Sequence, residues 1–117
     1  DFAINIINQI YGDICLLGVN GISAESGITT SLLPETVINT KMIERCKGQV
    51  IVLADSSKIG KTYSFTSAKL DSIDVLITSS LADEEEMEKI RAMNVGFVVI
   101  DMGTKDEKRL SGNEIVQ

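Results

Sequence analysis

The chain of 117 residues contains no histidine and no tryptophan, and it has only one proline and two cysteines. Without histidine it cannot supply a Ser-His-Asp triad, and neither cysteine has a second Cys or His at ligand spacing for a zinc site. Cys15 and Cys46 both lie in apolar patterns. This favours buried, reduced thiols over the alternative of a disulfide. We therefore expect no metal and no cofactor.

Basic runs are also lacking, and the formal net charge is −6. A negatively charged chain without interleaved aromatic and basic residues is poorly suited to binding a phosphate backbone. We therefore do not expect these residues to bind DNA themselves. The sequence shows no secretory signal and no apolar run of membrane-spanning length. We expect a cytoplasmic protein with no membrane partner. Because the first residue is Asp1 and not Met, we also expect the chain to be a fragment.

Apolar periodicity alternates between helix and strand spacing along the chain. Short apolar strands separated by helices imply crossover connections and a mostly parallel sheet with flanking helices, which is a Rossmann-like α/β fold. The glycine- and hydroxyl-rich stretch 20–30 is expected to be a loop. Helices are predicted at 2–10, 34–47 and 83–93, strands at 14–19, 49–54, 75–78 and 96–100, a short extended piece at 63–66 and a single turn at 70–73.

Two of the predicted helices carry clear local signals. In the second, Ile38, Met42 and Cys46 follow each other at a spacing of four residues and are expected on the buried face. The third is expected to open at Asp83, to bury Met87, Ile90 and Met93, and to end where Asn94 turns left-handed. The acidic run 83–86 suits the positive end of the helix dipole and is interpreted as a solvated helix start, not as a metal site.

Residues 50–61, VIVLADSSKIGK, combine an apolar run with a polar cluster. Such a run suits a strand buried on both faces, and in open α/β sheets ligands bind at the carboxyl ends of the strands. Asp55, Ser56, Ser57 and Lys58 are aimed at that edge, where the lysine offers a charge to an anion and the serines offer hydroxyls. The alternative is an ordinary capped loop.

A second candidate follows the first predicted strand. Gly18 and Gly21 would allow a ligand to approach the backbone closely, and Asn20 can both donate and accept hydrogen bonds. The alternative is an ordinary turn after a strand, because glycine pairs are common. The neighbouring loop, 23–30, is either a lid or a surface excursion.

Four stretches, GVNGIS, GITT, KMIERCKGQVIVLADSSKIGK and FTSAKLDSIDVLITSS, resemble the effector-sensing domain of DeoR-type bacterial transcriptional repressors. The resemblance runs from about Asp13 to Ile100. It implies a sugar-phosphate sensor similar in fold to ribose-5-phosphate isomerase and the CoA transferases. Residues 1–102 would then be the C-terminal part of the sensor domain, and 103–117 a polar, flexible tail.

The resemblance to the isomerase can be followed residue by residue. Its DGAD element falls on 17–20, where the glycine is kept but the two acids are replaced, and its DxSK element falls on Asp55, Ser57 and Lys58 intact. Counting back without gaps places its catalytic glutamate on Thr40, which cannot act as a carboxylate base. The resemblance therefore implies a binding site without catalytic residues, made of Gly18, Asn20, Gly21, Asp55, Ser57 and Lys58.

Two parts of the family pattern are missing from this sequence. The helix-turn-helix and the glycine- and threonine-rich phosphate loop should precede Asp1. Operator DNA would thus be a partner only through the missing domain, and a homo-oligomer is expected. Two alternatives remain open: an isomerase or CoA-transferase-like enzyme with Glu25 or Glu35 as base, and a pure assembly module.

Overall fold

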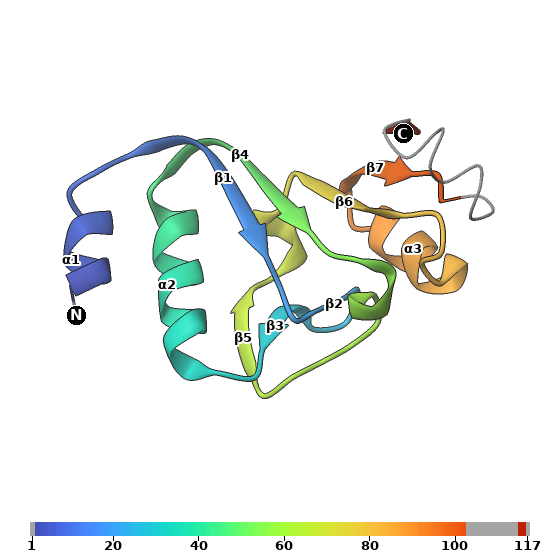
Figure 1. Ribbon diagram of the computed structural model, residues 1–117, viewed down its shortest axis with the longest axis horizontal. Coiled ribbons are helices and arrows are strands. Elements are labelled where there is room, and N and C mark those ends of the chain that lie inside the picture. Colours follow the sequence, from blue (N-terminus) through green and yellow to red (C-terminus); the bar gives the residue numbers. More distant parts are fainter. Residues whose placement is uncertain (1, 103–114, 117) are drawn as a thin grey trace.

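The computed structural model of the protein describes residues 2–102 and 115–116, and it shows an α/β fold built around a parallel sheet (Figure 1). The strand order of this sheet is β1-β4-β6-β7-β8. The predicted fold class is confirmed. The four parallel strands are β1 (Gly12–Gly18), β4 (Cys46–Leu53), β6 (Val75–Ser79) and β7 (Gly96–Ile100), and β8 (Ile115–Val116) pairs antiparallel with β7.

A second, antiparallel sheet contains β2 (Gly21–Ser23), β3 (Gly27–Thr30) and β5 (Phe65–Ala68). The prediction of a loop at 20–30 is therefore wrong. The stretch has turn composition, but Ile22 and Ile28 pair across the hairpin and are both fully buried. Gly27, with a φ of 74°, supplies the left-handed residue of the turn.

The described residues also form three helices and two 3-10 turns, of which all but the first helix connect strands. The N-terminal helix, α1, lies against α2 at one end of the molecule, and α3 lies at the other end with β6 and β7 (Figure 1). The turn predicted at 70–73 is confirmed as η2. The bounds are α1 (Phe2–Ile7), α2 (Leu33–Glu44), α3 (Glu84–Arg91), η1 (Ser56–Lys58) and η2 (Leu70–Ser72).

The helix ends agree with the sequence where the signal is local. Asp83 caps α3 by accepting a hydrogen bond from the Glu86 N–H at 2.9 Å, and Asn94 has a φ of 66°, as predicted. Two predictions are wrong. Cys46 is not on a helix face but begins β4, because pairing with β1 starts there and overrides helical spacing. Met93 lies past the end of α3 and is 48% exposed.

The core lies on one face of the parallel sheet. Register neighbours on β1, β4 and β6 point the same way, and those on this face are buried. Met42 and Ile43 of α2 pack against them, as do the small sheet and Met87 and Ile90 of α3. The buried sheet residues are Cys15, Leu17, Val50, Val52 and Leu76.

The opposite face of this sheet, which we call the open face, is apolar but uncovered by the described residues. Ile14 and Leu16 of β1 are 62% and 55% exposed, and Leu53 of β4 is 40% exposed. Parallel sheets are normally covered on both faces. The prediction that β4 is buried on both faces is thus wrong within the described part of the chain.

Two further features bear on the sequence-based expectations. In the described ranges, no helix combines the length and apolar character needed to cross a membrane. The predicted polar tail, 103–117, lies outside the described residues except for Ile115 and Val116, which form β8.

Candidate functional site

A cavity of about 390 Å³ opens where the carboxyl ends of β1 and β4 meet. The two strands end side by side, because Gly18 is the register partner of Leu53. The N-terminal half of α2 forms a third wall. The cavity is lined by Gly18, Val19 and Asn20 after β1, by Leu53, Ala54, Asp55 and Lys58 after β4, and by Glu35, Ile38 and Asn39 of α2.

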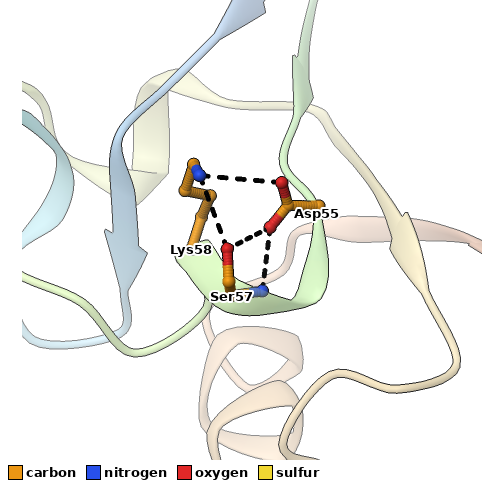
Figure 2. A network of polar contacts seen from close by, with 3 residues as sticks. All are labelled: Asp55, Ser57 and Lys58. Carbon is orange, nitrogen blue, oxygen red and sulfur yellow. Dashed lines mark hydrogen bonds and ion pairs between the residues drawn. The ribbon is translucent and has the colours of Figure 1, made fainter.

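Asp55, Ser57 and Lys58 form a closed network at this edge (Figure 2). Asp55 caps η1: its Oδ1 accepts from the Ser57 N–H at 2.9 Å and also from the Ser57 hydroxyl. The Lys58 ammonium lies 3.6 Å from Asp55 Oδ2 and donates to Ser57 Oγ at 3.4 Å. Asp55 and Lys58 are thereby linked both directly and through Ser57.

The network also sets the charge of this edge. The hydrogen bond from the Ser57 hydroxyl, with the Ser57 N–H and the Lys58 charge, lowers the pKa of the Asp55 carboxyl below its ordinary value. Asp55 is thus ionised at neutral pH, and it partly balances the charge of Lys58. Ser57 does not line the cavity but connects the two side chains that do.

Of the two glycines predicted on the β1 side of the site, only Gly18 lines the cavity. Gly18 lines the cavity, and a Cβ atom built on it would meet no atom within 4 Å. Gly21 does not line it, because its α-carbon faces the Lys61 carbonyl, whose oxygen would lie 2.5 Å from an added Cβ. Asn20 lines the cavity, and its Oδ1 accepts from the Ser31 N–H at 3.4 Å.

The wall formed by α2 was not predicted as part of the site. Glu35 and Asn39 lie one helical turn apart, and within the described part of the chain their side chains make no hydrogen bond or ion pair. A polar pair at i, i+4 was visible in the sequence, but nothing local indicates that this helix lies beside the strand edge. Thr40 faces elsewhere, because its hydroxyl donates to the Ser67 carbonyl at 3.1 Å.

A second cavity, also of about 390 Å³, lies on the other side of the β4 end. It shares Leu53, Ala54 and Asp55 with the first, and its lining also includes Ile77, Thr78 and Ser79 of β6 and Ile100 of β7. Among the described residues, unpartnered hydrogen-bonding groups occur at both cavities: Glu35 and Asn39 line the first, and Thr78, whose buried hydroxyl has no partner, lines the second. Glu25 lines neither cavity and faces a third one, beside α3.

Among residues 2–102 and 115–116, no three His, Cys, Asp or Glu side chains are grouped to hold a metal ion. Cys15 and Cys46 are free thiols, as predicted, although Cys46 is only half-buried. Burial, with a smaller contribution from Cys46, raises the pKa of the Cys15 thiol.

Comparison with known proteins gives a consistent result. The family model of the DeoR C-terminal sensor domain matches residues 1–80. The chain is 42% identical over 78 residues to the HTH-type transcriptional repressor GlcR of Bacillus subtilis, covering 67% of this chain and 30% of the repressor.

Two further relatives share less sequence identity with the chain. The chain is 34% identical over 89 residues to the HTH-type transcriptional regulator GlpR of Haloferax volcanii, covering 76% of this chain and 34% of that protein. It is 32% identical over 80 residues to the HTH-type transcriptional regulator UlaR of Shigella dysenteriae, covering 65% and 32%. The chain therefore spans about a third of the length of these relatives.

Proposed function

This chain belongs to the family of DeoR C-terminal sensor domains, and from that membership we propose that it senses a phosphorylated sugar for a DNA-binding transcriptional regulator. The relatives described above are HTH-type regulators. Operator DNA would be bound by a helix-turn-helix domain outside this chain. Phosphorylated sugars and operator DNA meet in the cytoplasm, so the proposal places the protein there.

The cavity beside Lys58 is the observation that carries the proposal. It combines an ammonium group, two carboxylates and two amides around a glycine, and a sugar offers many hydroxyls that both donate and accept. Lys58 would turn from Ser57 toward a phosphate or sugar oxygen. Asn20 and Asn39 would bind hydroxyls, and Gly18 would let the sugar approach the backbone.

Signalling would follow from differential affinity. An effector that binds one arrangement of the regulator better than another shifts the equilibrium between them, and thereby changes DNA affinity. We also propose that the regulator is a homo-oligomer, in which symmetry would allow the sensor to change the spacing of two DNA-binding domains. Sedimentation at several concentrations measures this, and a strict monomer would exclude it.

The sensing role is proposed in place of an enzymatic one. Glu35 lines the cavity and is the one carboxylate of the isomerase alternative that does so, whereas Glu25 does not. The relatives are named as regulators. We therefore expect no turnover of ribose 5-phosphate by the full-length protein. Turnover that is lost in Glu35→Gln would favour the isomerase.

Calorimetry with a panel of sugar phosphates on the full-length protein tests the proposal. Lys58→Ala is expected to weaken the best ligand by about 10- to 100-fold, the usual effect of losing a hydrogen bond to a charged group. Lys61→Ala is the matched control, because Lys61 is an exposed lysine three residues away that does not line the cavity. Unchanged affinity in Lys58→Ala would remove Lys58 from the site.

A further inference from the structure

The polar wall of α2 carries an inference about which end of the effector this chain recognises. Glu35 and Asn39 are on one side of α2 and line the same cavity as Asp55 and Lys58. Their side chains have no partner within the described part of the chain. Polar groups that line a cavity without internal partners are available to a ligand.

The charges of the cavity are unequal. Its ionisable lining consists of two carboxylates, Glu35 and Asp55, and one ammonium group, Lys58. Lys58 lies 3.6 Å from Asp55, as Figure 2 shows, so its charge is already partly balanced. The charge of Glu35 is therefore not balanced by the ionisable residues that line the cavity. A phosphate group placed beside Glu35 would be repelled, whereas a hydroxyl would find a strong acceptor.

We propose that Glu35 and Asn39 bind the sugar end of the effector, and that Glu35 makes this end selective for neutral or cationic sugars over sugar acids. The inference rests on the proposed function and deepens it. A carboxylate accepts hydrogen bonds from two hydroxyls or from an ammonium group, and the Asn39 amide both donates and accepts. The phosphate is then directed away from α2, toward Lys58 and beyond.

A purely structural role for Glu35 makes a different prediction. The residue lies in the first turn of α2, where a carboxylate also stabilises the helix dipole. That role would change stability, and any loss of binding that follows from unfolding would be the same for every ligand. Selectivity according to the charge of the ligand separates the two roles.

The test uses three six-carbon sugar derivatives that share the 6-phosphate and differ in charge elsewhere in the molecule. Glucose 6-phosphate is neutral there, glucosamine 6-phosphate carries an ammonium group, and 6-phosphogluconate carries a carboxylate. Their affinities are measured by calorimetry, up to millimolar concentrations, for the full-length protein and its Glu35→Gln variant. Ratios between ligands are compared across the two proteins, so that differences in ligand shape cancel.

In Glu35→Gln, the affinity of 6-phosphogluconate relative to glucose 6-phosphate should rise by about fivefold. That of glucosamine 6-phosphate should fall by about fivefold, as expected for one pair of charges about 4 Å apart in water. Glu44→Gln is the control, because Glu44 is also on α2 but pairs with Lys41 at 3.1 Å outside the cavity, and its ratios should not change.

Each failure has its own meaning. If the ligands bind and Glu35→Gln leaves both ratios unchanged, the inference is overturned and the proposed function stands. If none of the three binds the unmodified protein, the inference is also overturned. The proposed function falls with it only if the rest of the sugar phosphate panel fails as well.

Discussion

Gly18 ends β1 and Gly21 begins β2, but the space around a methyl group added at each position differs. At Gly18 an added Cβ has open space, with nothing within 4 Å. At Gly21 it would lie 2.5 Å from the Lys61 carbonyl oxygen and 3.1 Å from the Thr29 hydroxyl. Two alanine substitutions therefore test whether each glycine serves a ligand or the fold.

The expected changes in stability have opposite signs. Alanine at a glycine position without strain or clash reduces the entropy of the unfolded chain, so Gly18→Ala should raise the free energy of unfolding by about 0.5–1 kcal/mol. Gly21→Ala forces backbone atoms apart and should lower it by about 1–3 kcal/mol. For a chain of this length, 1 kcal/mol corresponds to about 4 °C in Tm.

Thermal unfolding and effector calorimetry measure the two roles separately. Gly18→Ala should melt at a higher temperature but bind the best sugar phosphate about tenfold more weakly, because the methyl group fills space that the ligand needs. Gly21→Ala should melt lower. A Gly18→Ala protein with undiminished affinity would refute the close approach of ligand to this backbone, and a neutral Gly21→Ala would refute the contact with Lys61.

Four other predictions concern the fold and its surfaces. Glu86→Ala removes the carboxylate that accepts a hydrogen bond from the Ala24 N–H of the β2–β3 hairpin at 2.8 Å. It should lower the free energy of unfolding, measured by chemical denaturation, by about 1–2 kcal/mol. Glu84→Ala, on the exposed side of the same helical turn, should lower it less. Ellman's reagent should label Cys46 before Cys15, and equal rates would contradict the burial of the latter. Because the pKa of Cys15 is raised in the folded state, the unfolded chain ionises first, so stability should fall as pH rises above about 8.5. Leu16→Glu on the open face should lower the binding of a hydrophobic dye by this chain, and unchanged dye fluorescence would show that this face is covered.

The parts of the fold that the sequence predicted depend on local signals. The cap at Asp83 and the left-handed turn at Asn94 are set by residues within one turn of each helix end. The hairpin of the small sheet was missed because its composition is that of a turn, and only tertiary burial of Ile22 and Ile28 selects strands. The end of α2 was misplaced because Cys46 obeys the pairing of β4 with β1, which helical spacing does not report.

In the candidate site, too, the residues set by local sequence could be predicted and those set by tertiary packing could not. Asp55 and Lys58 could be predicted because they follow a buried strand directly, and strand ends converge at one edge of a sheet. Glu35 was named only as a possible base of the enzyme alternative, and neither it nor Asn39 could be assigned to the binding site, because only the packing of α2 brings them to that edge. Gly21 shows the remaining difficulty: a sequence does not tell whether the space left by a glycine faces a ligand or the chain itself.

The ion pair between Lys58 and Asp55 has a consequence for the dose response of the proposed sensor. Lys58 already has an internal partner 3.6 Å away and would have to leave it to bind the metabolite. The free energy of binding is therefore reduced by the free energy of the broken ion pair. The midpoint of the response then lies at a higher metabolite concentration than an unpaired lysine would give. The proposed sensor would then respond when the metabolite accumulates and not to trace amounts. Because Asp55 itself lines the cavity, a substitution at position 55 would change both this threshold and the groups that face the ligand.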